Sequence, residues 1–258
     1  MWRPLMILEK FRLDGRTALI TGASRGLGQG MALGLAEAGA DLAVVARGDL
    51  SETASLVEKL GRRCLQIRAD LADRRDVRAI VDKTLGEYSR IDVLVNNAGT
   101  IRRAEFLDFT EDDWDAVIKV NLDSVFFLSQ AVARAMVKRG KGGKIIHTAS
   151  MLSFQGGIRI ASYTAAKSGV MGLTRIMANE LAKHNINVNA IAPGYMATEL
   201  TSTLQNDPVR NKAILERIPA GRWGSPDDLK GAVVFLASEA SSYMHGYTIA
   251  VDGGWLAR

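Results

Sequence analysis

The sequence predicts an α/β fold in which a mostly parallel, doubly wound sheet of seven strands carries helices on both faces. Short apolar runs alternate with longer segments of helical periodicity along the chain, and this alternation indicates βαβ units. Right-handed crossovers between parallel strands then place helices on both faces of the sheet. The 258 residues, 47% of them hydrophobic, can bury one large core. We therefore interpret residues 1–258 as a single domain.

Seven apolar runs bounded by turn residues predict the strands. They are residues 16–21, 41–46, 64–69, 91–95, 143–149, 187–192 and 247–251. Between them, apolar residues recur every three to four positions, which predicts helices. These are residues 27–39, 50–60, 73–88, 111–138, 162–184 and 227–239. Residues 194–222 lack a clean period and follow a strand end, so we interpret them as a mobile lid over a substrate.

A glycine-rich turn, T-G-A-S-R-G-L-G at residues 21–28, joins the first predicted strand to the first predicted helix. A helix N-terminus in this setting binds phosphate, because its free N–H groups and its dipole attract negative charge. Gly22 suits the tight turn, Gly26 lets the backbone approach a pyrophosphate, and Gly28 lets the helix pack near the sheet. The spacing differs from the commonest dinucleotide fingerprint, and a purely structural loop is the alternative.

Asparagines occur at two further places where ligand binding is expected. Asn96 and Asn97 follow the fourth predicted strand, and the carboxyl ends of parallel strands are where doubly wound sheets bind ligands. They either bond backbone across neighbouring strand ends or line a cofactor cleft, and an ordinary turn is the alternative. Asn121 lies in a strongly apolar helical run. It is either satisfied locally in the core or holds a water that connects Lys167 to solvent.

The segment from Ser150 to Lys167 indicates proton transfer to or from an alcohol or carbonyl oxygen. Tyr163 and Lys167 are four residues apart in a predicted helix, so their side chains share one face. An ammonium beside a phenol lowers the phenol pKa from its ordinary value of ~10, and we expect Lys167 to act on Tyr163 in this way. The tyrosine then exchanges a proton with an oxygen that Ser150 hydrogen-bonds. Taken alone, the Tyr-x-x-x-Lys spacing also arises by chance.

In their order along the chain, these motifs resemble those of the short-chain dehydrogenase/reductase family. The similarity runs from about Gly15 to Arg258 and includes Pro193-Gly194 with Thr198. It implies a Rossmann-type enzyme that binds a nicotinamide dinucleotide. It also implies a catalytic tetrad, formed by Asn121, Ser150, Tyr163 and Lys167. A homotetramer is expected, because such assemblies are common in the family and the two longest predicted helices carry more apolar surface than one sheet needs.

Charge at the tip of the second predicted strand favours NADP over NAD. Ala46 stands where an NAD enzyme often has an acid that binds the adenosine ribose. Arg47, just beyond it, can pair with a 2′-phosphate, and Arg25 in the glycine turn is near enough to help. NAD stays the alternative, because Asp41 and Asp49 are also nearby.

The expected cofactor contacts come from several parts of the chain. They are Gly22, Ser24, Arg25, Gly26, Leu27, Gly28, Arg47, Asp70, Leu71, Asn97, Ala98, Gly99, Tyr163, Lys167, Pro193, Gly194 and Thr198. The family resemblance suggests that Asp70 bonds the adenine ring and that Leu71 flanks it.

Longer stretches extend the resemblance to family members that act on sugar acids of pectin and uronate breakdown, among them S-M-L-S-F-Q-G-G-I-R and V-D-G-G-W-L-A-R. This implies interconversion of 2-dehydro-3-deoxy-D-gluconate and its 2,5-diketo form. The alternatives are a gluconate 5-dehydrogenase, a 3-oxoacyl-type reductase on the same scaffold, and a dinucleotide sensor without activity. A carboxylate substrate favours arginines near the reacting carbon. The candidates are Arg102, Arg103 and Arg159, each of which is otherwise a surface residue.

Composition argues against several other classes. The net charge of +5 comes from scattered basic pairs, so no nucleic-acid partner is expected. The three histidines have no ligand spacing, which predicts no metal site. The single cysteine, Cys64, excludes an intrachain disulfide and suits a reducing compartment.

The first residues do not have the pattern of a signal peptide. We also expect no apolar segment long enough to span a membrane, which takes ~20 residues. We expect a cytoplasmic protein without a membrane partner. Met6 is an alternative start to Met1, with Trp2–Leu5 as an upstream extension.

Overall fold

Seven parallel strands form one sheet in the order β3-β2-β1-β4-β5-β6-β7. The computed structural model describes residues 6–258, so Trp2–Leu5 and the choice between Met1 and Met6 lie outside the described range. The strands are β1 (Thr17–Thr21), β2 (Asp41–Ala46), β3 (Cys64–Arg68), β4 (Val93–Asn96), β5 (Gly143–Thr148), β6 (Ile186–Pro193) and β7 (Thr248–Val251). Each agrees with its predicted bounds to within two residues, and the doubly wound α/β fold is confirmed.

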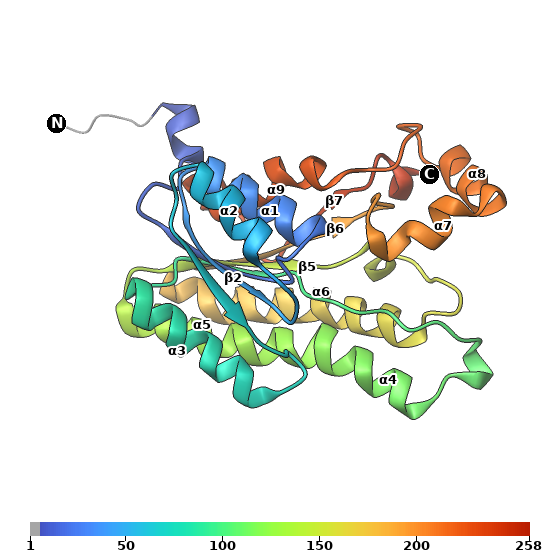
Figure 1. Cartoon of the computed structure of the whole chain (residues 1–258). Helices are drawn as coiled ribbons and strands as arrows, with labels where there is room; N and C mark the ends of the chain where they lie inside the picture. Colours follow the sequence, from blue (N-terminus) through green and yellow to red (C-terminus); the bar gives the residue numbers. More distant parts are fainter. Residues whose placement is uncertain (1–5) are drawn as a thin grey trace.

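Helices cover both faces of this sheet (Figure 1). One face carries α1 (Gly26–Glu37), α2 (Ser51–Lys59) and α9 (Lys230–Ala237). The other carries α3 (Arg74–Tyr88), α4 (Glu111–Ile118), α5 (Ser124–Arg139) and α6 (Ala161–Leu181). Each face has its own apolar core, so the central strands are buried on both sides. This explains why β1 and β6 are buried at every position rather than at alternate ones.

The strand order reverses between β1 and β4. The chain runs from β1 outward through β2 to β3 and then returns to the other side of β1, where Ile20 pairs with Val95. A crevice opens at the carboxyl ends of two strands whose connections leave in opposite directions, and doubly wound sheets bind ligands there. The glycine turn after β1 and the two asparagines at the end of β4 therefore meet at this reversal.

The predicted helix 111–138 is interrupted. Its middle, η3 (Lys119–Asp123), is a π-helical turn in which the Ser124 N–H reaches back to the Lys119 carbonyl. Such turns insert one extra residue into a helix and occur mostly at functional sites. Asn121 lies inside this turn. Periodicity alone did not predict the interruption, because apolar residues continue through it.

The segment 194–222 contains two short helices that the sequence analysis missed, α7 (Ser202–Asn206) and α8 (Pro208–Arg217). Asp207 caps α8 by accepting hydrogen bonds from the N–H groups of Val209 and Arg210, both at 3.0 Å. An aspartate followed by proline is a recognised helix start, so a local signal was present. Both helices lie at one end of the molecule (Figure 1). That they move as a lid stays a prediction.

The expectation about membrane segments was too strict. The helical run Glu111–Arg139 contains an 18-residue window with a mean hydropathy of 1.3, which meets the length and composition of a membrane span. In the fold, this run packs against the sheet, α3 and α6, and 44% of that window is buried. Its buried apolar residues, among them Leu128, Val132 and Met136, belong to the core on that face of the sheet.

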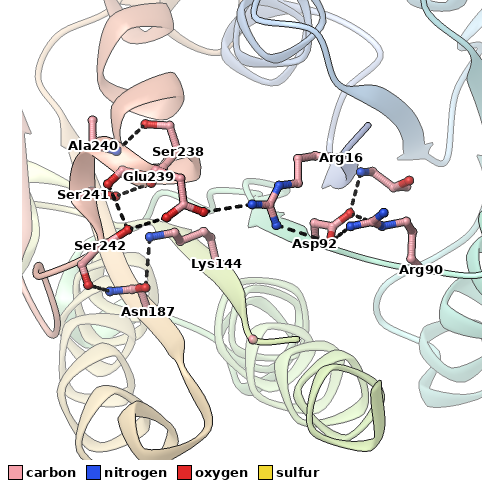
Figure 2. A network of polar contacts seen from close by, with 12 residues as sticks. Arg16, Arg90, Asp92, Lys144, Asn187, Ser238, Glu239, Ala240, Ser241 and Ser242 are labelled. Atoms are coloured by element: carbon pink, nitrogen blue, oxygen red, sulfur yellow. Dashed lines mark hydrogen bonds and ion pairs between the residues drawn. The ribbon is translucent and has the colours of Figure 1, made fainter. Parts of the chain in front are cut away.

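A polar network around the buried Asp92 lies where the strands begin, at the end of the sheet away from the glycine turn (Figure 2). Asp92, just before β4, is 1% exposed and accepts hydrogen bonds from Arg90, Arg139 and the Thr17 N–H. Arg16 extends the network from Asp92 to Glu239. Lys144 and Asn187 form a neighbouring pair at 3.0 Å.

Candidate active site and dinucleotide cleft

The glycine turn forms an open cradle at the N-terminus of α1. Gly22 packs so closely on the loop after β4 that a Cβ there would lie 2.8 Å from the Ala98 Cα. Gly26 has a φ of +58°, and its missing side chain leaves space bounded by the Thr198 methyl group, 3.6 Å from where a Cβ would stand. No side chain caps α1, so its first N–H groups are free to bind a phosphate. These features fit a dinucleotide pyrophosphate.

Asn97 fastens the two strand ends that flank this cradle. Its Nδ2 donates to the Thr21 and Gly22 carbonyls at 3.0 and 3.2 Å, and its backbone N–H donates to the Thr21 hydroxyl. Asn97 therefore has one of the two expected roles, because it hydrogen-bonds backbone groups of a neighbouring strand end. Asn96 does neither, because its amide points into the core and contacts Ser129 and His147. A neighbouring pair in sequence thus has opposite orientations on a strand.

Asn121 is fully buried and clamps the loop after β4. Its Oδ1 accepts from the Thr100 N–H at 2.8 Å, and its Nδ2 donates to the Thr100 carbonyl at 3.0 Å. The side-chain amide therefore has its hydrogen-bond partners within the core, which was one of the two interpretations of this residue. That this residue also holds a water connected to Lys167 stays a prediction.

Ser150 follows β5 and begins a short 3₁₀ turn, η4 (Met151–Ser153). Its Oγ accepts a hydrogen bond from the Leu152 N–H at 3.2 Å. This bond uses a lone pair and not the hydroxyl proton, so Ser150 can still donate to the Tyr163 oxygen or to a substrate oxygen.

Tyr163 and Lys167 are one turn apart on α6, with the Lys167 Nζ 5.7 Å from the centre of the Tyr163 ring. Lys167 is buried, and its Nζ donates to the Thr148 carbonyl at 2.6 Å. Burial lowers the pKa of Lys167 to about 8. The ammonium form is therefore still the major one at neutral pH, although it is less favoured than in water.

Several influences act on the pKa of the Tyr163 phenol. Burial raises this pKa, while a hydrogen bond with Ser150 and the positive charge of Arg103 act in the opposite direction. The Nζ of Lys167 is directed to the Thr148 carbonyl, a direction that the sequence spacing could not predict. That the ammonium also lowers the phenol pKa stays a prediction.

The three candidate substrate arginines have different partners. Arg102 pairs with Asp113 and Arg159 pairs with Glu105, each at 3.2 Å. Arg103 has no ion-pair partner among residues 6–258 and acts electrostatically on Tyr163. It is therefore the arginine of the three that is placed to meet an anionic substrate near the candidate proton donor.

The residues expected to select the cofactor are exposed at the edge of the cradle. The Arg47 side chain is 73% exposed and lies 4.0 Å from Asp70. Arg25 pairs with Glu199 at 2.5 Å, which links the glycine turn to the segment after Thr198. Leu71 is nearly buried beside Asp70. Arg47 is thus the exposed cation at the tip of β2 that can reach a 2′-phosphate, whereas Arg25 would have to exchange Glu199 for it.

The other expected cofactor residues fall into three groups around the same edge. Ser24 and Leu27 belong to the turn and first residues of α1, Ala98 and Gly99 follow β4, and Pro193 and Gly194 end β6.

The sequence analysis missed three residues that position this site. Thr148 supplies the carbonyl that binds Lys167, and Thr100 supplies the backbone that binds Asn121. Ser153 hydrogen-bonds backbone groups of both Ser150 and Lys167. The Ser-x-x-Ser spacing at 150–153 was a detectable signal, because a polar residue three positions after a cap often bonds back to it. Backbone carbonyls carry no such signal.

A family model described as enoyl-(acyl carrier protein) reductase matches residues 22–256. The 2-dehydro-3-deoxy-D-gluconate 5-dehydrogenase of Dickeya dadantii is 61% identical over 98% of this chain and 100% of its own length. A solved Agrobacterium tumefaciens structure with bound NADP is 52% identical, with a TM-score of 0.91 over 96% of this chain and 99% of that one. The gluconate 5-dehydrogenase of Burkholderia cenocepacia, solved with NADP and tartrate, is 44% identical, with a TM-score of 0.93 over 98% and 100%.

Proposed function

The chain belongs to the short-chain dehydrogenase/reductase family and is an NAD(P)-dependent oxidoreductase acting on CH–OH groups, and we propose that it interconverts 2-dehydro-3-deoxy-D-gluconate and its 2,5-diketo form. The observation that carries this proposal is the 61% identity, over 98% of this chain, to the 2-dehydro-3-deoxy-D-gluconate 5-dehydrogenase of Dickeya dadantii. Within the site, the Ser150 hydroxyl and the positive charge of Arg103 both act on the Tyr163 phenol. A proton donor, an oxygen-binding hydroxyl and a cation are the groups that the reaction of a hydroxy acid requires.

In reduction, Tyr163 donates its phenolic proton to the substrate oxygen. Burial keeps this phenol protonated at neutral pH, which suits the role of a general acid. Ser150 donates its hydroxyl proton in a hydrogen bond to the same oxygen and stabilises the charge that develops there. In oxidation Tyr163 accepts the hydroxyl proton, and this direction requires a higher pH because the phenolate must form first.

A bound nicotinamide exchanges hydride with the substrate carbon. Among this chain's residues, the glycine turn and the free N–H groups of α1 would hold its pyrophosphate, and Lys167 would bind near its ribose. The chemistry of the tip of β2 favours NADP, since Arg47 and Arg25 can pair with a 2′-phosphate and Ala46 offers no acceptor to the ribose. NADP bound to the Agrobacterium relative supports this preference.

Asn121 influences the reaction through the loop after β4. By clamping Thr100 through two hydrogen bonds, it fixes the loop that carries Arg102 and Arg103. The π-helical turn presents its amide to that loop. We assign Asn121 to the catalytic tetrad with Ser150, Tyr163 and Lys167.

We also propose that the enzyme is a homotetramer of single-domain subunits in which residues 194–222 close over the substrate. Apolar side chains exposed on α5 and α6, including Phe126 and Val137, support the assembly.

The test of the substrate is a matrix of purified enzyme against 2-dehydro-3-deoxy-D-gluconate, gluconate and a 3-oxoacyl thioester, each with NAD and NADP in the matching redox state. We expect the highest kcat/KM with 2-dehydro-3-deoxy-D-gluconate and NADP. Tyr163→Phe removes the proton donor and should lower kcat by about 100-fold or more. Preferred turnover of the thioester would refute the sugar-acid assignment, and wild-type turnover by Tyr163→Phe would refute the role of the phenol.

A further inference from the structure

Ser153 lies between two residues of the proposed catalytic site without facing the substrate. It is the last residue of η4 and is 7% exposed. Its Oγ donates to the Lys167 carbonyl at 2.6 Å and accepts from the Ser150 N–H at 3.3 Å. One hydroxyl therefore uses its proton on the backbone of α6 and a lone pair on the backbone of the loop after β5.

These bonds complete a closed ring of contacts. Lys167 is held at its side-chain end by the Thr148 carbonyl and at its backbone by Ser153, and Ser153 returns to Ser150, two residues after Thr148. The connection 154–160 joins the loop to the helix in sequence, and η4 also packs against α6. The ring thus sets the position of the Ser150 hydroxyl relative to Tyr163 and Lys167 on α6.

We propose that Ser153 is a positioning residue for this reaction, and that its hydroxyl fixes the loop of Ser150 against the helix that carries Tyr163 and Lys167. This inference rests on the proposed acid–base roles of those residues, but it requires no particular sugar acid. Without the hydroxyl, the Ser150 N–H loses its acceptor and the loop is free to shift against α6. Displacements of about 1 Å in a reacting group lower rates by up to ~100-fold.

The test compares Ser153→Ala, Ser153→Thr and the matched control Ser162→Ala. Ser162 is fully buried on the same helix beside Tyr163, yet its Oγ has no hydrogen-bond partner among residues 6–258. We expect Ser153→Ala to lower kcat by about ten-fold or more, with the dissociation constant for NADP within about two-fold of wild type. The limb of the pH–rate profile that Tyr163 sets, which is the basic limb in reduction and the acid limb in oxidation, should move to higher pH, because the Ser150 hydrogen bond acts to lower the pKa of the phenol. Ser153→Thr, which keeps the hydroxyl, should restore most of kcat.

Three outcomes would overturn the proposal. One is a kcat for Ser153→Ala that stays near wild type, and another is an equal loss in Ser162→Ala, which would indicate a general effect of altered packing. The third is a lower melting temperature with an unchanged pH profile, which would make Ser153 merely structural. A wild-type enzyme that turns over a different substrate would refute the proposed function but would leave this comparison intact, because all variants are measured on whichever substrate the wild type uses.

Discussion

At the scale of single residues, the arginines after β4 show how an ion pair within the protein determines whether a guanidinium is free to bind a substrate. Arg102 and Arg103 are adjacent in sequence, but the guanidinium of Arg102 is engaged by Asp113. Arg103 instead acts on the Tyr163 phenol. A guanidinium whose charge is not neutralised by a carboxylate of the protein is free to pair with a carboxylate of the substrate, and such charged hydrogen bonds contribute about 1.5–3 kcal/mol each.

Replacing Arg103 with methionine should therefore raise the KM for the sugar acid by about 10-fold or more. It should also move the pH–rate profile to higher pH, because the lost positive charge had lowered the pKa of Tyr163. Steady-state kinetics between pH 6 and pH 10, in steps of about half a unit, measure both effects across the titration range of a phenol. Arg102→Met is the control and should change KM by less than about three-fold, since its partner is Asp113. Equal effects of the two variants would contradict the assignment.

At the scale of elements, α5 and α6 show a face that the sheet leaves uncovered. Their inner sides pack on the sheet, while Phe126, Val137, Met177 and Leu181 line a groove of about 410 Å³ on the outside. Gln130, Arg134, Lys138 and Glu180 line the same groove, and apolar groups bordered by polar ones are typical of association surfaces. This surface of two neighbouring helices supports the proposed tetramer.

Phe126→Asp should convert the tetramer into smaller species, because it puts a charge into an apolar contact. Light scattering coupled to size-exclusion chromatography measures the mass directly. Phe106→Asp is the matched control, because Phe106 is 81% exposed on another part of the surface. A wild-type mass of one chain, or an unchanged mass in Phe126→Asp, would contradict the proposal.

At the scale of the whole molecule, the residues of the candidate site and a network of charged residues that stabilises the fold lie at opposite ends of the strands. The candidate site occupies the carboxyl edge of the strands, and the Asp92 network occupies the amino edge (Figure 2). Burial acts to raise the pKa of Asp92, but hydrogen bonds from Arg90, the Thr17 N–H and Arg139 outweigh it and hold the pKa below its ordinary value. This carboxylate therefore stabilises the fold above pH ~4, and its contribution is lost as the pH falls through the lower folded-state pKa.

Asp92→Asn should destabilise the protein by about 2–3 kcal/mol at pH 7, because it removes the charged hydrogen bonds that a buried carboxylate accepts from partly exposed arginines. Chemical denaturation at several pH values should show that the difference from wild type shrinks below pH ~4. Turnover at a temperature where both proteins are folded should stay unchanged. Asp14→Asn, in an exposed pair with Arg12, should leave the unfolding midpoint nearly unchanged. A large loss of kcat in Asp92→Asn would contradict the separation of the two edges.

Local patterns predicted the strands, their parallel arrangement and the residue types of the candidate site. Apolar runs bounded by turns, a glycine turn between strand and helix, and the four-residue spacing of Tyr163 and Lys167 are all properties of short segments. The same patterns missed α8, because residues 194–222 show no clean apolar period. Asp207 and Pro208, which cap and begin this helix, were its only local signal.

The sequence by itself determined the order of the elements and which side chains face one another within a single helix. Only the tertiary structure decided that the Lys167 ammonium binds the Thr148 carbonyl and that Ser153 joins two segments of the site. It also decided that Arg102 pairs with Asp113 while Arg103 has no ion-pair partner within residues 6–258. These facts depend on groups that are distant in sequence and on backbone atoms that every residue shares. No local pattern of residue types encodes them, so packing around the sheet had to bring the partners together before the direction of each hydrogen bond was defined.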